Sequence, residues 1–355
     1  MLGGRALGTV DAPLPAASVV TAAVAIVART FQPKGVGFVQ LLVTGGGGFI
    51  GSHLVERLVQ DGHSVRVIDN FTTGHRRNLA PVLDDVDLVE GDLQSYERAH
   101  AAVRGCEIVL HQAAMPSVPR SVQDPLTSNA SNVIGTLNIL LAARDAGVRR
   151  VVFASSSSVY GASPGLPKEE GLPALPISPY AVAKLAGEGY CRSFTEVYGL
   201  ETIALRYFNV FGPRQDPQSQ YAAVIPNFIV AALHGKAPTI YGDGEQSRDF
   251  TYVDNVVDAN VLAMSAPDVG GRTYNISCGD RISLNDLVAT IGRVLGRTIE
   301  PRYEPPRPGD VRHSMADVTR AREDLRYDVA VGFEEGLART VEFYAVEDSP
   351  ARVEA

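Results

Sequence analysis

The sequence predicts an α/β protein with a doubly wound parallel sheet and a smaller C-terminal α/β lobe. Two observations carry this prediction. From Val39 to about Asn209, short apolar runs rich in β-branched residues alternate with segments of helical period, as in a parallel sheet covered by helices on both faces. Four consecutive glycines at positions 45–48 join the first apolar run to the first helical segment. The chain has 355 residues and is 45% hydrophobic, which is enough apolar material for two lobes.

Six apolar runs predict the strands of the sheet: VQLLVTG, SVRVIDN, VDLVEGD, CEIVLHQAA, RRVVFASS and ETIALRYFN. Between them, segments such as GSHLVERLVQDG and NVIGTLNILLAARDAG have helical period and end on a glycine, as helix C-termini often do. Beyond residue 209 the pattern changes to Pro/Gly-rich loops with interspersed helices such as SLNDLVATIGRVLG. We expect residues 39–208 to form the sheet domain and 209–345 mainly a second domain, with some segments returning to the first. Residues 346–355 are expected to be a tail.

Composition and the N-terminal residues limit the class of protein. The net charge of -8 argues against a nucleic-acid partner. The three cysteines are far apart and not in CxxC spacing, which fits a reducing cytosol. An Ala/Val-rich run over residues 16–28 is too short to cross a bilayer. We expect residues 1–38 to be a disordered extension or the product of a misplaced start codon, with a signal peptide as the alternative. The expected location is the cytoplasm, without membrane contact.

The glycine run has the spacing of a phosphate-binding loop. Gly45, Gly48 and Gly51 follow a predicted strand and open a predicted helix. In the dinucleotide-binding (Rossmann) fingerprint, the first glycine allows the tight turn, the second lets the backbone approach a pyrophosphate, and the third lets helix and strand pack closely. Backbone N–H groups and the helix dipole bind the anion. Gly46 and Gly47 are expected to be spacers without a role.

Two acidic residues end the next strands. Asp69 closes SVRVID, 18 residues beyond Gly51, where a carboxylate accepts the hydroxyls of an adenosine ribose and repels a 2′-phosphate. This predicts NAD in preference to NADP, although Arg76 and Arg77 follow a few residues later. Asp92, in VEGDL, ends the third strand where an adenine edge would lie. A strand-end aspartate without a ligand is the alternative for both positions.

A tyrosine and a lysine stand one helical turn apart in SPYAVAKLAGEGY. Only four of the 32 basic residues are lysines, so Lys184, four residues after Tyr180, is informative. A phenol needs a lowered pKa to act as a base near neutral pH, and a cation about 4 Å away supplies roughly the required 4 kcal/mol. We expect Lys184 and the positive nicotinamide ring to activate Tyr180. The run of serines from Ser155 to Ser158 ends a predicted strand, where a hydroxyl can bind the sugar oxygen that Tyr180 deprotonates.

Together these motifs resemble the extended short-chain dehydrogenase/reductase superfamily, and within it the NAD-dependent nucleotide-sugar epimerase/dehydratase family. The resemblance is closest to the UDP-glucose and UDP-N-acetylglucosamine 4-epimerases. It covers about Val39 to Tyr344, and TGxxGxxG, DN, GDL, HQAA, SSSSVYG, YxxxK and RYFNVFGP occur in the order and spacing of that family.

The resemblance assigns residues to three roles. It implies that Ser156, Tyr180 and Lys184 are catalytic, with Ser156 and Tyr180 also touching the substrate. The implied NAD contacts are Gly45, Gly48, Phe49, Ile50, Gly51, Asp69, Asn70, Thr73, Asp92, Leu93, Gln112, Ala113, Asn132, Lys184, Tyr207 and Phe208. The implied ligands of the sugar nucleotide are Asn209, Arg248, Arg307, Asp310 and Ser314. None of the seven histidines falls in metal-ligand spacing, and no metal is expected.

The implied reaction is inversion of C4 of a UDP-hexose through a 4-keto intermediate. Related 4,6-dehydratases carry Asp and Glu where this chain has Ser157 and Ser158, and UDP-glucuronate decarboxylases carry Glu at the second position, so both chemistries are disfavoured. Ser314, at the position that gates sugar size, leaves room for an N-acetyl group. UDP-glucuronate 4-epimerisation stays an alternative, as does a non-catalytic NAD-binding regulator. The family also implies a homodimer formed by helices around residues 127–146 and 180–198.

Overall fold

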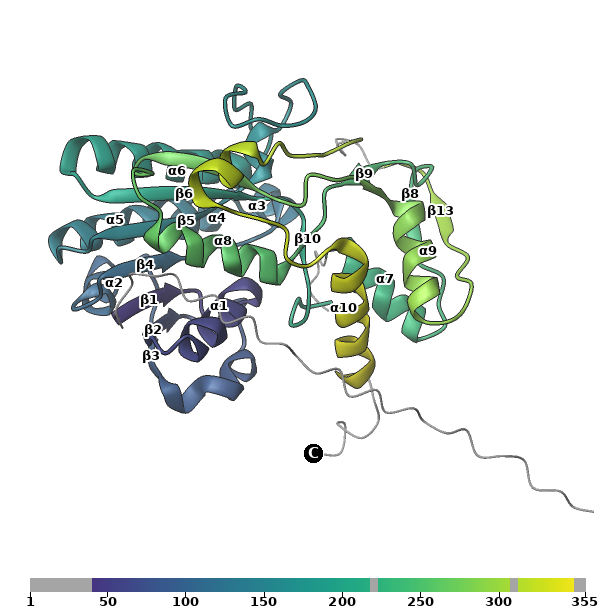
Figure 1. The fold of residues 1–355 in the computed structure, drawn as a ribbon, viewed down its shortest axis with the longest axis horizontal. Coiled ribbons are helices and arrows are strands. Elements are labelled where there is room, and N and C mark those ends of the chain that lie inside the picture. Colours follow the sequence, from purple (N-terminus) through teal and green to yellow (C-terminus); the bar gives the residue numbers. More distant parts are fainter. Residues whose placement is uncertain (1–39, 218–222, 307–311, 348–355) are drawn as a thin grey trace, which may run out of the picture. The chain divides into compact units, whose positions relative to one another are not determined.

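A seven-stranded parallel sheet is the centre of the protein (Figure 1). The computed structural model describes residues 40–217, 223–306 and 312–347, which belong to one compact unit. The strand order is β3-β2-β1-β4-β5-β6-β11, and every neighbouring pair is parallel. The strands are β1 (Gln40–Thr44), β2 (Ser64–Asp69), β3 (Val86–Glu90), β4 (Ile108–His111), β5 (Arg150–Ser156), β6 (Glu201–Tyr207) and β11 (Arg272–Ile276).

Helices cover both faces of this sheet, so the strands are buried on both sides. Leu41 and Val43 of β1 face a core shared with α1 and α8, whereas Leu42 faces a core shared with α2, α5 and α6. The helices of this part are α1 (Phe49–Gln60), η1 (Arg76–Asp85), α2 (Tyr96–Val103), α5 (Gly135–Asp145), η3 (Ser157–Tyr160), α6 (Pro179–Tyr198), α8 (Val253–Ser265) and η4 (Ala321–Leu325). The predicted doubly wound α/β fold is confirmed.

The six predicted strands are all present, within a few residues of the predicted runs. Gly62 and Gly147, which follow α1 and α5, have φ values of 86° and 70°, as expected for residues that end a helix. The seventh strand, β11, was not predicted. It comes from the second half of the chain and pairs with β6 from Arg272 to Ile276, so later residues complete the first sheet.

A second hydrophobic core lies in the smaller C-terminal lobe. It is formed by α7 (Val224–Leu233), α9 (Leu284–Val294) and α10 (Phe333–Glu347), which Figure 1 shows grouped on one side of the sheet. Phe211, Phe250 and Phe333 pack against one another, with ring centroids 5.8 to 6.3 Å apart. Three two-stranded ladders join this lobe together: β7 (Val210–Phe211) with β10 (Thr251–Tyr252), β8 (Thr239–Tyr241) with β13 (Arg302–Glu304), and β9 (Ser247–Arg248) with β12 (Ile282–Ser283).

The strand order reverses direction between β1 and β4. Ligands of open α/β sheets bind beyond the carboxyl ends of the strands at such a switch point. Here the glycine run follows β1, and the Gln112 segment follows β4. Beyond it, α3 (Val118–Gln123), α4 (Pro125–Asn129) and the π-helical turn η2 (Ala130–Ile134) lead into α5. The fold therefore predicts a ligand site at this edge of the sheet.

Candidate active site

The glycine loop is shaped by close backbone contacts. Gly45 has φ +69°, and a Cβ there would lie 2.7 Å from the Cα of Ala113. A Cβ on Gly51 would lie 2.1 Å from the carbonyl oxygen of Gly45, so the start of α1 packs directly on the turn. The N–H of Gly48 donates to the same carbonyl at 3.1 Å. A loop this tight presents its backbone to a pyrophosphate, as the fingerprint requires.

The expectation that Gly46 and Gly47 are free spacers is wrong. A Cβ on Gly46 would come within 2.6 Å of a Val67 methyl group, and one on Gly47 within 2.7 Å of the Phe71 ring. The N–H of Gly47 also donates to Asp69 at 2.8 Å. Gly46 and Gly47 therefore have a packing reason, because this part of the loop lies against β2 and the turn that follows it.

Asp69 is buried at the end of β2 and is fixed by the backbone. One of its oxygens accepts the Gly47 N–H and the other accepts the Phe71 N–H, both at 2.8 Å. Burial raises the pKa of Asp69, and these backbone hydrogen bonds lower it in part. The guanidinium of Arg76 is engaged elsewhere, since it pairs with Glu90 and lies 4.5 Å from the Phe71 ring centroid. The Asp69 carboxylate thus contacts the glycine loop, whereas Arg76 pairs with Glu90.

The other predicted cofactor residues lie along the same sheet edge. Asp92 accepts hydrogen bonds from Asn70 at 3.0 Å and from the N–H of Gln94 at 2.8 Å. Asn132, buried in η2, holds the Met115 backbone through both its amide oxygen and nitrogen. The remaining predicted contacts are at the start of α1 (Phe49 and Ile50), in an exposed turn (Thr73), after β3 (Leu93), after β4 (Gln112 and Ala113) and at the end of β6 (Tyr207 and Phe208).

Two buried networks behind this edge were not predicted. His111, at the end of β4, lies between the hydroxyls of Thr44 and Thr136 at 2.7 and 3.0 Å. Burial lowers its pKa to about 3, so its imidazole is neutral. Asn260 of α8 bonds to Gln112 and to the Tyr207 hydroxyl, at 2.9 and 2.8 Å. His111 was visible in the HQAA motif, whereas nothing local in the sequence marks Asn260.

Ser156, Tyr180 and Lys184 come together in the structure. Ser156 is the last residue of β5 and hydrogen-bonds to Tyr180, which is the second residue of α6. The Lys184 ammonium lies 5.8 Å from the Tyr180 ring centroid and donates to the Ala154 carbonyl at 2.7 Å. The Ser178 hydroxyl caps α6, which fixes where this helix begins. Strand β5 and helix α6 thus present the three side chains at one point.

Burial governs the acid–base properties of this group. It raises the pKa of Tyr180 to about 12, while the hydrogen bond from Ser156 works in the opposite direction. It also lowers the pKa of Lys184 to about 8, against the pull of nearby Glu188. In the chain alone, desolvation therefore governs the pKa of Tyr180, and the lowering expected from Lys184 is not among the causes of its shift. A phenol of this kind gives up its proton near neutral pH only when further positive charge lies beside it.

Glu188 was overlooked, although it stands four residues after Lys184 on the same face of α6. It accepts a 2.5 Å hydrogen bond from Ser155 and forms a buried pair with Arg206 at 2.8 Å. The guanidinium of Arg206 lies 4.7 Å from the Tyr160 ring centroid. This pair connects the ends of β5 and β6 to α6, beneath the serine and the tyrosine.

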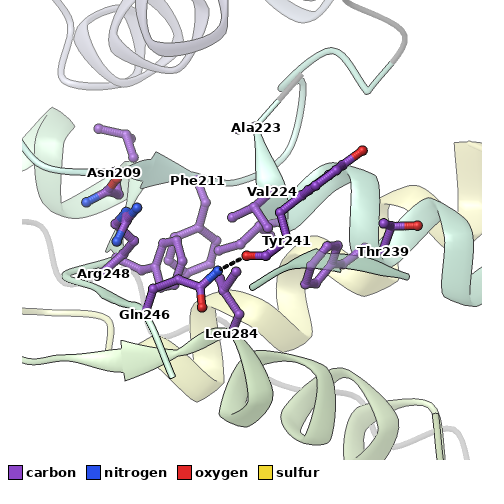
Figure 2. Close-up of a pocket in the computed structure, with 13 residues that line it drawn as sticks. Asn209, Phe211, Ala223, Val224, Thr239, Tyr241, Gln246, Arg248 and Leu284 are labelled. Carbon is purple, nitrogen blue, oxygen red and sulfur yellow. Dashed lines mark hydrogen bonds between the residues drawn. The ribbon is translucent and has the colours of Figure 1, made fainter. Parts of the chain in front are cut away.

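A pocket of about 310 Å³ lies in the C-terminal lobe (Figure 2). Asn209 and Arg248 lie at the same end of it, with Tyr241 and Thr239 toward the other. Its lining is mainly apolar: Asn209, Val210, Phe211, Ala223, Val224, Ile225, Phe228, Thr239, Tyr241, Gln246, Arg248, Phe250 and Leu284. Such a cavity with a polar end suits a flat ring joined to an anionic group.

The structure describes three of the five predicted ligands of the sugar nucleotide. Asn209 donates from its side chain to the Asp249 carbonyl at 3.2 Å, and Arg248 donates to the Ser247 carbonyl at 2.9 Å. Ser314 is half-buried, and its N–H donates to the Ser247 carbonyl at 3.1 Å. Arg307 and Asp310 lie outside the described residues, as do residues 1–38 and most of the predicted tail.

Two searches of the described residues bear on the class of site. No group of three or more His, Cys, Asp or Glu side chains in that part of the chain is arranged to hold a metal ion. No helix within residues 40–217, 223–306 and 312–347 is long and apolar enough to span a membrane.

Comparison with known proteins identifies the family. The model of the NAD dependent epimerase/dehydratase family matches residues 41–277. The chain belongs to this family. A UDP-glucose 4-epimerase of Mycolicibacterium smegmatis is 43% identical over 307 residues, which are 85% of this chain and 97% of that protein. The epimerase/dehydratase fold, the glycine loop and Asp69 agree with the cofactor of the family, which is NAD.

Solved structures of the family have the same fold. A UDP-N-acetylglucosamine 4-epimerase from Methanobrevibacter ruminantium M1, in complex with UDP-N-acetylmuramic acid, has a TM-score of 0.84 and 41% identity. The match covers 88% of this chain and all of that one. A Thermus thermophilus UDP-glucose 4-epimerase in complex with NAD has a TM-score of 0.78 and 38% identity, over 86% of this chain and 98% of its own. The protein is thus an NAD-dependent enzyme of the epimerase/dehydratase family.

Proposed function

We propose that the protein inverts C4 of a UDP-hexose through a 4-keto intermediate. The observation that carries the proposal is the cluster of Ser156, Tyr180 and Lys184 at the sheet edge that also holds the glycine loop. NAD, when bound, supplies the acceptor for hydride from sugar C4. Ser157 and Ser158 occupy the positions where related dehydratases and decarboxylases carry acids, so this site lacks the groups for loss of water or carbon dioxide.

The side chains of the cluster have separate tasks in this reaction. Ser156 binds the sugar 4-oxygen and passes a hydrogen bond to Tyr180, which takes the 4-OH proton. With a pKa near 12, Tyr180 is protonated in the chain alone, so its deprotonation depends on positive charge that arrives with the cofactor. Lys184 contributes its ammonium, which is protonated over much of the neutral range because its pKa is about 8. The same phenol returns the proton after the keto sugar has turned over.

The pocket of the C-terminal lobe supports a uridine diphosphate as the anchor. Its apolar walls suit a pyrimidine ring and ribose, and Arg248 at its end suits a diphosphate, which planar guanidinium groups bind well. An anchored nucleotide leaves the sugar free to rotate between the two hydride transfers. We propose Asn209, Arg248, Arg307, Asp310 and Ser314 as ligands, with Ser314 leaving room for an N-acetyl group.

Turnover of a panel of UDP-sugars by wild type and Y180F tests this function. Wild type should interconvert UDP-glucose with UDP-galactose, and the N-acetylated pair as well. Y180F should lose about 10²- to 10⁴-fold in kcat, the size expected for general acid–base catalysis, yet keep its bound NAD. Conversion of UDP-glucuronate alone would replace the substrate assignment. An active Y180F, or a wild type that converts no UDP-sugar, would contradict the function, and the latter favours a non-catalytic NAD-binding role.

We also propose a homodimer through α4 and α6. These helices contact each other and expose large apolar side chains: Leu126 is 82% exposed, Val182 53% and Val197 66%. Exposed apolar side chains on neighbouring helices suit a protein interface, and a two-fold dimer pairs one face with its own copy. L126D should shift the mass in sedimentation to that of a monomer, whereas L83D, at an exposed leucine of η1, should not. A monomeric wild type would contradict the proposal.

A further inference from the structure

Asp249 is a fully buried carboxylate in the C-terminal lobe that the proposed reaction does not use. It follows Arg248 directly, and its side chain is 0% exposed. A carboxylate in such a position is costly unless hydrogen bonds replace its water. Burial raises the pKa of Asp249 to about 6, and hydrogen bonds from surrounding groups oppose this rise.

The partners of this carboxylate come from two distant segments. One oxygen accepts the Ala316 N–H at 3.0 Å, and the other accepts the Cys278 N–H at 3.2 Å. The Ser277 hydroxyl and the backbone of Asp280 also donate to it. Because each oxygen is held by a different segment, the carboxylate fixes the turn of residues 277–280 and the strap of residues 312–317 relative to each other.

The strap of residues 312–317 crosses between two parts of the fold. At one end, Ser247 exchanges backbone hydrogen bonds with Arg312 and Ser314, at 2.9 and 3.1 Å. At the other, Lys168 exchanges them with Met315 and Asp317, at 2.7 and 2.9 Å. The bond from Ala316 to Asp249 lies between these two ends, so Ser314 is held on one side by its own bond to Ser247 and on the other by the carboxylate.

The proposed ligands of the sugar nucleotide meet around the same aspartate. The Asn209 amide donates to the backbone carbonyl of Asp249, and Arg248 is its neighbour in the chain. Ser314 belongs to the strap, which the Asp249 carboxylate holds through the Ala316 N–H. None of the hydrogen-bond partners of the Asp249 carboxylate described above lines the pocket or belongs to the glycine loop, so the carboxylate acts on these three ligands indirectly.

We infer that Asp249 is the positioning residue of the substrate side, a carboxylate that sets Asn209, Arg248 and Ser314 in one arrangement for the UDP-sugar. This inference rests on the proposed function and extends it. It predicts that loss of the carboxylate weakens binding of UDP and of the UDP-sugar, while the cofactor site, held by other contacts, is unaffected.

The test compares D249N with N255D. Asn255 of α8 is also 0% exposed, and its side chain also fixes a distant segment, through the backbone of Ala330 and Val331 at 2.8 to 3.0 Å. Each variant exchanges a carboxylate and an amide at a buried side chain that hydrogen-bonds to the backbone of a distant segment. The segment that Asn255 holds, however, contains none of the proposed ligands. A general loss of stability should therefore affect both variants, whereas a loss of substrate positioning should affect one.

We expect D249N to raise KM for the UDP-sugar and Kd for UDP at least tenfold, with kcat within about threefold of wild type and bound NAD unchanged. N255D should change KM less than twofold. Equal changes in KM for the two variants would overturn the inference.

If D249N does not fold, S277A, which removes one donor to the carboxylate, should raise KM two- to fivefold, and an unchanged KM would overturn the inference. A wild type that binds no UDP by calorimetry contradicts the proposed function itself, whereas normal UDP binding by D249N contradicts the inference alone.

Discussion

The cofactor side and the substrate side of this enzyme are held together in different ways. On the cofactor side, the glycine loop and the acid beside it belong to one βαβ unit, since Gly51 packs on Gly45 and the Gly47 N–H donates to Asp69. On the substrate side, Asn209, Arg248 and Ser314 are far apart in sequence and meet through hydrogen bonds to Asp249 and Ser247. The comparison teaches that motifs of neighbouring residues are enough to predict the cofactor, whereas the substrate site depends on contacts between residues far apart in the sequence.

The first prediction tests the local character of the cofactor side and has the largest expected effect. In G51A, the new Cβ would lie 2.1 Å from the Gly45 carbonyl, so helix α1 and the turn cannot keep their contact. We expect near-complete loss of bound NAD, measured by absorbance of the denatured protein, and with it loss of turnover. Overpacking of this kind costs roughly 1–3 kcal/mol or more.

The matched control for this variant is G171A. Gly171 is exposed outside the helices and strands, and a Cβ there would meet nothing within 4 Å. An alanine at such a position restricts the unfolded chain and stabilises a protein by about 0.4–1 kcal/mol, so G171A should be slightly more stable than wild type and keep its NAD. Retention of NAD by G51A would show that the loop is less tightly packed than the structure indicates.

The division between the two sides explains what sequence could and could not predict. The six predicted strands are confirmed. They could be predicted because parallel strands that are buried on both faces have continuous runs of apolar residues. Strand β11 was missed because its letters, RTYNI, are only half apolar and lie among loops, and its partner β6 is about 70 residues away. Membership of the sheet there is decided by pairing and not by local preference.

The candidate site shows the same limit. Ser156, Tyr180 and Lys184 were predicted from motifs and come together in the structure. The pKa values of Tyr180 and Lys184 could not be predicted in the same way, because desolvation depends on all the residues packed around them. Asp249 directly follows Arg248, a predicted ligand, but its role depends on Ala316 and Cys278, which no spacing in the sequence connects to it. Gly46 was read as a spacer because Val67, which it packs against, lies on the next strand.

The second prediction concerns Lys184, whose burial as a cation destabilises the folded chain. Its pKa is about 8 in the fold against 10.5 in the unfolded chain, so the unfolded chain binds the proton more tightly. The resulting penalty is fully present below pH 8 and is relieved as the pH rises from 8 to 10.5, over which it amounts to about 3 kcal/mol. Stability of the cofactor-free wild type should rise relative to K184M across this window.

Urea unfolding of cofactor-free wild type and K184M at pH 7, 8.5 and 10 measures this difference. The hydrogen bond of Lys184 to Ala154 is lost in the variant at every pH, so only the change with pH reports the buried charge. Parallel stability curves for the two proteins would mean that Lys184 is not desolvated in the folded chain. Such a result would also remove the reason to place Lys184 in a dry site beside Tyr180.

The smallest expected effect concerns Arg76, which the sequence left as a reason to doubt NAD. The arginine pairs with Glu90, and both side chains are more than half exposed, so the pair contributes about 0–1 kcal/mol at most. If Asp69 and not Arg76 reads the ribose, R76A should change NAD affinity less than about threefold, as R77A at the exposed neighbouring position should, and neither should alter the preference for NAD over NADP. Binding of both cofactors to the stripped proteins by calorimetry measures this. A selective fall in NADP affinity in R76A, absent in R77A, would mean that the arginine reaches a 2′-phosphate, and the cofactor side would then depend on more than its local motif.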